Sequence, residues 1–299
     1  MRFADAMSIA AWLASGIGPL PRHGNVAVAV VLALGSSGCY AASAVLQERE
    51  ASRCDVDTAA LLPQLMRRPW WWLAVLATIT GAGLHIAALS LGPLSLVQPL
   101  GVLTLVFALP LGARLGARVV TRREWSAASA VALGLAGVLA VAPHHAPSSH
   151  LPLAVVGATT AAIAVLVLIL IGLAARLPPR VAPVVRATAA ATCFGFASGM
   201  TRIAATGAAP IALAAAIAVL GAAAGLGLAQ LAYRTGGLGA PLATQILVDP
   251  LVAVLLGVAL LEEPVQLTPG TVTIGLAGLA ATITGIWALT RPAPPATPP

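Results

Sequence analysis

Nine stretches of this chain are apolar over about 20 residues each. A helix of that length crosses the hydrocarbon core of a bilayer, so each stretch predicts one membrane-spanning helix. Hydrophobic residues make up 59% of the chain and charged residues 8%, which leaves too little polar surface to cover a soluble protein. We therefore expect an all-α, polytopic transmembrane bundle in the cell membrane. The stretches lie at about residues 25–46, 71–92, 93–113, 125–142, 151–174, 183–206, 208–232, 238–260 and 268–290.

The two ends of the chain differ from these stretches. Residues 1–24 hold a weaker apolar run at 7–20 that glycines and a proline interrupt. The run is too short to span a bilayer unaided, so it predicts an interfacial segment, with a tenth span as the alternative. Residues 291–299 are rich in proline, which predicts a disordered tail.

The chain is internally duplicated. Leu-Val-Gln-Pro-Leu at 96–100 returns as Leu-Val-Asp-Pro-Leu at 247–251, and both times Gly-Leu-Ala-Gly follows in the next apolar stretch. The likeness thus covers two consecutive helices. We expect a first repeat at 25–143 with four clear spans and a second repeat at 144–290 with five. Such internal repeats are typical of secondary transporters.

The arginines predict the orientation of the spans. They fall in the loops after the first, third, fifth and seventh stretches and are absent from the loops after the second, fourth, sixth and eighth. Because cytoplasmic loops collect basic residues, the C-terminus is predicted to be cytoplasmic. The two Pro-centred helices are then an odd number of crossings apart and run in opposite directions. This is an inverted repeat, the arrangement that supports alternating access.

Polar residues at membrane depth are the candidate site. Asp249 is the only carboxylate inside a predicted span, and it directly precedes Pro250, which frees a backbone carbonyl one turn back. This pair predicts a proton or cation site at a helix break. The alternative is an aspartate that is neutral, or paired with Arg186 or Arg202, and serves packing alone.

Gln98 takes the matching place in the first copy, beside Pro99, so the two repeats are expected to offer an amide and a carboxylate across the pseudo-twofold axis. Other polar residues in or beside the spans are further candidates for lining a substrate or ion pathway. A lone histidine in a membrane is also explained by an interhelical hydrogen bond. The further candidates are His85, Gln245, Gln230 and Tyr40.

Tryptophans and glycines predict how the helices sit and pack. The run Trp70 to Trp72 follows two arginines and predicts anchors at the headgroup level, with an aromatic cage as the alternative. Glycine pairs four residues apart let helix backbones approach closely, either within the chain or between two copies in a homo-oligomer. The pairs are Gly195 with Gly199 and Gly221 with Gly225.

Several chemistries lack their sequence motifs. The chain has no phosphate-binding loop and no nucleophile elbow, so we expect neither an enzyme nor a bound cofactor. His144, His145 and His150 do not have metal-site spacing, and no metal site is predicted. The net charge of +7 suits contact with anionic lipid better than nucleic acid.

The inverted duplication, the Pro-centred helix and the Gly-Leu-Ala-Gly helix together resemble the drug/metabolite transporter superfamily with its EamA-type repeats. Leu-Leu-Glu-Glu-Pro at 260–264 stands where that superfamily has a Leu-Gly-Glu turn. The resemblance covers nearly the whole chain. It implies a carrier with a substrate cavity between the repeats.

The first half more closely resembles the NIPA-type magnesium transporters of the same superfamily. Ser36 and Ser37 in the first stretch, the tryptophan run and Leu-Val-Gln-Pro-Leu-Gly-Val-Leu at 96–103 carry this likeness. Gln98 departs from it, because a small hydroxyl residue is expected there. Gln-Glu-Arg-Glu at 47–50 also stands where a basic run is usual.

The sequence therefore favours a secondary carrier that moves a small solute by alternating access, coupled to an ion or proton gradient through Asp249. A magnesium-type divalent cation pathway is the first alternative. A membrane scaffold without transport activity is the second, and it requires every buried polar residue to be paired with another helix.

Overall fold

The computed structural model describes residues 24–56, 58–91, 97, 100–116, 119–139, 151–207, 209–261 and 268–290. Over these ranges the chain is helical and contains no strand, which confirms the all-α class. The helices are α2 (Gly24–Ser52), α3 (Thr58–Leu65), α4 (Pro69–Leu91), α6 (Leu103–Leu115), α7 (Arg122–Leu139), α8 (Leu153–Ala174), α9 (Ala182–Thr206), α10 (Ile211–Gly236), α11 (Gly239–Leu261) and α12 (Pro269–Thr290).

Six helices in the described part of the chain are long and apolar enough to cross a bilayer, namely α2, α4, α8, α10, α11 and α12. This result fits an integral membrane protein. The other stretches predicted as spans also contain helices, but α6 has 13 residues, and α7 and α9 are not among the helices long and apolar enough to span. The nine-span topology therefore stays a prediction, and the suggested N-terminal span at 7–20 lies outside the described residues.

The first helix is longer than the sequence predicted. We expected it to end at residue 46, whereas α2 continues to Ser52 and includes Gln47 and Glu50. These two residues are only 7% and 3% exposed. Their burial is tolerated because Gln230 and Arg68 provide partners for their polar side chains. Asp249 was predicted to be the only carboxylate within a span, whereas Glu48 and Glu50 also lie in the candidate span Val26–Ser52.

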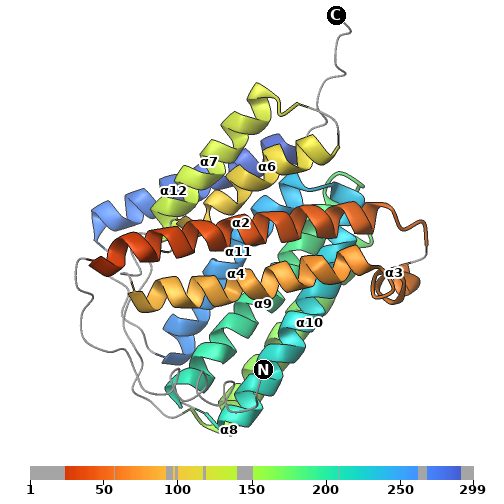
Figure 1. Ribbon diagram of the computed structural model, residues 1–299. Coiled ribbons are helices and arrows are strands. Elements are labelled where there is room, and N and C mark those ends of the chain that lie inside the picture. The colour runs from red at the N-terminus through yellow and green to blue at the C-terminus, as the bar shows by residue number, and fades with distance from the viewer. Residues whose placement is uncertain are drawn as a thin grey trace, which may run out of the picture.

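The helices pack in a pattern that occurs twice. Helix α2 packs along α4, as Figure 1 shows, and α9 packs along α10. Helix α6 contacts α2 and α7, while α11 contacts α9 and α12. Helices α7 and α12 pack extensively against each other and join the two sets.

Glycines allow the closest of these approaches. A methyl group placed on Gly278 of α12 would overlap the carbonyl oxygen of Gly134 of α7, so the two backbones touch. On α9, a methyl group on Gly195 would lie 2.5 Å from the carbonyl oxygen of Asp249 of α11. Gly225 of α10 faces Phe194 of α9 in the same way. Both predicted glycine pairs thus pack within the chain, and the homo-oligomer remains a prediction.

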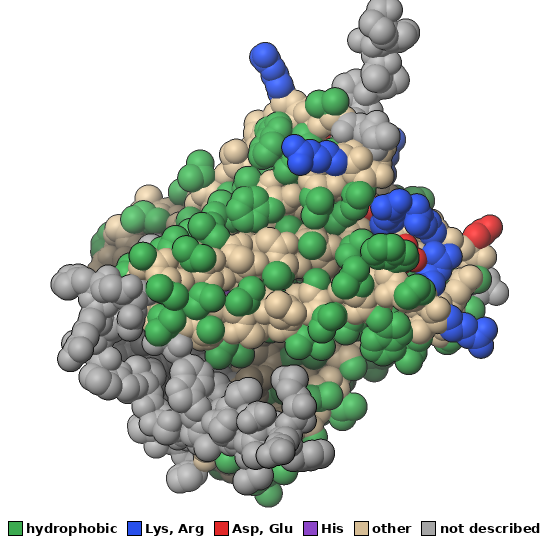
Figure 2. Space-filling model, in the orientation of Figure 1, with side chains coloured by type: hydrophobic (Ala, Val, Ile, Leu, Met, Phe, Trp, Pro, Cys, Tyr) green, Lys and Arg blue, Asp and Glu red, His purple; other side chains and the backbone are tan. Residues whose placement is uncertain are grey.

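The tryptophan run divides between core and surface. Trp71 is 3% exposed and packs with Leu61 and Leu65 of α3, whereas Trp70 and Trp72 are exposed. Trp71 thus fixes α3 to the bundle, and the headgroup anchors stay a prediction for the exposed Trp70 and Trp72. Figure 2 shows basic side chains at the α3 end of the molecule and at the ends of α6 and α7, and an apolar surface along the helices.

Candidate functional site

A polar stripe runs along one face of α2. Its residues are three or four positions apart, a spacing that places side chains on the same side of a helix. Tyr40 is half-buried and the other four are at most 7% exposed. We refer to this set as the α2 stripe: Ser36, Tyr40, Ser43, Gln47 and Glu50.

Helix α4 covers two members of the α2 stripe. The hydroxyl of Ser36 donates to the carbonyl of Gly81 at 2.8 Å. The hydroxyl of Ser43 lies 2.7 Å from the carbonyl of Ala74 and 2.6 Å from the hydroxyl of Thr78. These bonds hold α2 and α4 together where lipid provides no hydrophobic force between helices.

Helix α10 adds the amide of Gln230 to the stripe. Its Nε2 donates to Oε1 of Gln47 at 2.7 Å, and Nε2 of Gln47 donates to the hydroxyl of Ser43 at 2.8 Å. Gln230 is fully buried. A chain of hydrogen bonds therefore connects α10, α2 and α4 inside the bundle.

An ion pair closes the end of the α2 stripe nearest to α3. Oε2 of Glu50 lies 2.8 Å from the guanidinium of Arg68, and Oε1 lies 3.5 Å from that of Arg53. The hydrogen bond with Glu50 raises the pKa of Arg68 above its ordinary value, so the Arg68 guanidinium stays protonated and positively charged. The Glu50 side chain is 4% exposed, which makes these arginines its counter-ions in a buried place.

Asp249 lies on α11, which runs through Pro250 as one helix. Pro250 has no amide hydrogen, so the carbonyl one turn earlier lacks its usual donor. The Asp249 backbone contacts Gly195 of α9, and its carboxyl lies within electrostatic range of the Tyr40 hydroxyl on α2. No ion pair to Asp249 is present among the described residues. Asp249 therefore lies where α11 packs on α9, and its charge interacts with the Tyr40 hydroxyl of α2.

The other predicted site residues lie in several places. Gln245 of α11 lies near Tyr233 of α10, and its Nε2 donates to the carbonyl of Pro241 at 3.3 Å. His85 is half-buried on α4. The structure thus places Tyr40 within electrostatic range of Asp249, and it brings Gln230 into hydrogen-bond contact with the α2 stripe.

Gln98 and Pro99 lie outside the described residues, so the predicted amide and carboxylate pair across the axis is untested. The nearby residue Leu100 is described, and its carbonyl accepts a hydrogen bond from Ser37 at 2.8 Å. Of the arginines considered as partners for Asp249, Arg186 donates to Thr235 at 3.0 Å. The side chain of Arg202 is outside the described part.

Sequence reasoning missed Ser43, Gln47, Glu50 and Thr78. A signal was present, because the spacing from Ser36 through Tyr40 to Glu50 marks one helical face. This signal was missed because the first span was predicted to end at residue 46, which assigned Gln47 and Glu50 to a loop. In the described residues, no group of three or more His, Cys, Asp or Glu side chains could hold a metal ion.

No family model and no solved structure matches the chain. The chain is similar to an uncharacterised protein of Corynebacterium glutamicum, with 36% identity over 118 residues. The matched region is 38% of this chain and 40% of the relative, so the match spans about two fifths of the curated relative's length. The relative is itself uncharacterised, so the proposal below depends on the residues described above.

Proposed function

We propose that the protein is a secondary transporter of the drug/metabolite type that moves a small solute across the membrane by alternating access, with Asp249 as its coupling residue. The observation that carries this proposal is the Asp249 carboxyl inside the apolar helix α11, beside Pro250 and within electrostatic range of the Tyr40 hydroxyl of the α2 stripe. A carboxylate inside an apolar bundle is costly, and such residues commonly mark ion or substrate pathways.

The repeated packing supports an inverted repeat. Helices α2, α4, α6 and α7 have the same packing relations as α9, α10, α11 and α12, and the Gly134–Gly278 contact joins the two sets. In this assignment Tyr40 belongs to the first set and Asp249 to the second. Transporters built from inverted repeats bind substrate at the interface of the repeats, near the bilayer midplane.

A substrate-independent experiment separates a carrier from a scaffold. Single cysteines replace Asp249, His85 and Gln230 in a chain whose own cysteines have been changed to alanine, and a water-soluble thiol reagent is applied to proteoliposomes. A carrier leaves Asp249 and His85 facing common water, so both cysteines react. Protection of both positions at every pH and ion condition would instead support the scaffold.

A flux experiment tests coupling. Proteoliposomes that contain a pH-sensitive dye receive amino acids, nucleosides or lipophilic amines, and proton movement is recorded. We expect a solute that drives proton movement with the wild type and with Asp55→Asn, a matched control in an exposed loop, but not with Asp249→Asn. Equal rates for wild type and Asp249→Asn contradict the proposal.

The same vesicles, loaded with a magnesium indicator, test the divalent cation alternative. Magnesium entry that depends on Asp249 would assign the protein to that branch. Magnesium prefers oxygen ligands and keeps several waters, so one carboxylate and neighbouring carbonyls form a sufficient site only if the ion stays hydrated.

A further inference from the structure

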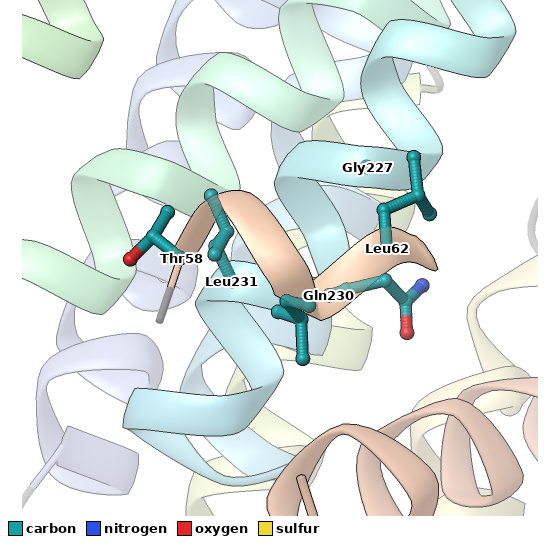
Figure 3. A pocket seen from close by; sticks show the side chains of 6 residues that line it. Thr58, Leu62, Gly227, Gln230 and Leu231 are labelled. Atoms are coloured by element: carbon teal, nitrogen blue, oxygen red, sulfur yellow. The ribbon is translucent and has the colours of Figure 1, made fainter. Parts of the chain in front are cut away.

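A groove with a volume of about 190 Å³ lies between α3 and α10. Figure 3 shows that both helices contribute to its lining. The groove is open at the surface of the molecule, since Leu62 is 37% exposed and Thr58 is also exposed. Most of the lining is aliphatic, so in a bilayer it suits contact with lipid chains. The lining residues are Thr58, Leu61, Leu62, Gly227, Gln230 and Leu231.

The groove lies near one end of α10. This helix has 26 residues and a length of about 39 Å, enough to cross the hydrocarbon core and most of both interfaces. Leu231 comes five residues before its last residue, Gly236, which is about 8 Å along the axis. The polar interface of a bilayer is about 5–8 Å deep on each side. The aliphatic lining is therefore expected at the level of the acyl chains, and the last turn of α10 at the level of the headgroups.

Thr235 and Arg186 form a polar contact one turn beyond this lining. Thr235 follows Leu231 by four residues, which places the two side chains on the same face of α10. The hydroxyl of Thr235 donates to the carbonyl of Leu231 at 2.9 Å and accepts from Nη1 of Arg186 of α9 at 3.0 Å. This contact is exposed. A guanidinium is thus held beside the end of the groove that faces the headgroups.

The Arg186 guanidinium has donors left for a ligand. It carries five N–H donors, and within the described chain its hydrogen bond to Thr235 uses one of them. No ion pair joins it to a carboxylate of the described residues, whereas Arg53 and Arg68 share Glu50. Arg234 adds a second positive charge to the last turn of α10. An anion is the ligand that matches this end of the groove.

We infer that the groove between α3 and α10 binds one acyl chain of an anionic phospholipid, with the lipid phosphate at Arg186 and Thr235. Guanidinium groups bind phosphate through paired, charge-assisted hydrogen bonds, and basic sites between transmembrane helices commonly hold anionic headgroups. The chain extends from the headgroup level along Leu231 and Gly227. The site is separate from Asp249 and does not require transport.

Native mass spectrometry of the purified full-length protein tests the inference. The protein is titrated in detergent with dioleoylphosphatidylglycerol or with dioleoylphosphatidylcholine, which have the same chains but differ in net charge. We expect the first phosphatidylglycerol to bind with a Kd at least about fivefold lower than that of phosphatidylcholine. Equal Kd values would overturn the inference. Glycerol 3-phosphate, which has no chains, should not displace the lipid, and displacement would show a phosphate site without a lipid groove.

Two arginine variants locate the headgroup. Arg186→Gln should raise the Kd of phosphatidylglycerol about fivefold and leave that of phosphatidylcholine unchanged. Arg122→Gln, at an exposed position at the start of α7, is the control and should change either Kd less than twofold. An unchanged preference for phosphatidylglycerol in Arg186→Gln would contradict the headgroup site.

Two glycine variants locate the chain. A methyl group on Gly227 would meet one atom within 4 Å, Cδ2 of Leu62 at 3.9 Å, so Gly227→Leu extends into the groove and should weaken the binding of both lipids. Gly172→Leu, at an open position on α8, should leave it unchanged. Unchanged binding in Gly227→Leu contradicts the groove. If that variant does not fold, Leu62→Gln places a polar group at an exposed position of the lining and decides the matter.

Discussion

Nε2 of Gln230 on α10 donates a 2.7 Å hydrogen bond to Oε1 of Gln47 on α2. This contact joins residues 183 positions apart, and both side chains are at most 7% exposed. It therefore links the first and second sets of helices through an amide pair that neither water nor lipid reaches.

The amide pair predicts a measurable coupling between the two glutamines. Gln47→Leu and Gln230→Leu each leave a buried amide group without its partner, so each should lower the free energy of unfolding by about 1–3 kcal/mol. The double variant should be destabilised by less than the sum of the two. Interhelical hydrogen bonds in membranes have coupling energies of about 0.6 kcal/mol on average, so the difference should be of that order.

Unfolding in mixed micelles, followed by circular dichroism, gives the three free energies. Thr159→Val on α8 is the control, because its hydroxyl bonds only to the carbonyl of Val155 in its own helix. Strict additivity of the two glutamine variants would show that the bond contributes no specific coupling.

The backbone contact between α7 and α12 predicts that Gly134 and Gly278 do not tolerate alanine. Added methyl groups overlap backbone atoms of the facing helix, and these atoms cannot move without separating the helices. We expect Gly278→Ala to lower the midpoint of thermal unfolding by several degrees. Gly157→Ala on α8, where no atom lies within 4 Å, should change it little. A melting curve of Gly278→Ala that overlays the wild type would contradict the close approach.

Much of the fold follows from sequence because long apolar stretches have few ways to satisfy their backbone other than helices. The site follows only in part. Asp249 is recognisable because it is a charge in an apolar stretch, but nothing local to it indicates that the Tyr40 hydroxyl lies within electrostatic range. From composition alone, the polar residues Gln47 and Glu50 indicate the end of a span. Their burial depends on the partners Gln230 and Arg68, which could not be recognised because they are distant in sequence.

The buried ion pair predicts unequal effects for two neighbouring arginines. Arg68→Met removes the closer counter-ion of Glu50 and leaves Arg53, which is 3.5 Å away and half-exposed. Breaking a buried ion pair lowers stability by about 3–5 kcal/mol. Because Arg68 is 30% exposed, we expect Arg68→Met to cost no more than the low end of this range. Arg67→Met, an exposed neighbour, should cost far less.

The double variant Glu50→Leu with Arg68→Met provides the complementary measurement. Replacing both charges with apolar side chains of similar size avoids an unpaired buried carboxylate, so stability should return towards that of the wild type. A double variant less stable than Arg68→Met would show that Glu50 has a further essential partner.

The electrostatic interaction between Tyr40 and Asp249 leads to the last prediction, which concerns transport. Tyr40→Phe removes only a hydroxyl, so the helices should pack as before while the carboxyl loses a polar neighbour. We expect the rate of solute-driven proton movement to fall several-fold, with no change in melting temperature. Tyr233→Phe is the matched control, because Tyr233 is the chain's other tyrosine and lies near Gln245 rather than within electrostatic range of Asp249. If both phenylalanine variants reduce the rate equally, Tyr40 acts through general packing of the bundle, and its hydroxyl has no specific part in coupling at Asp249.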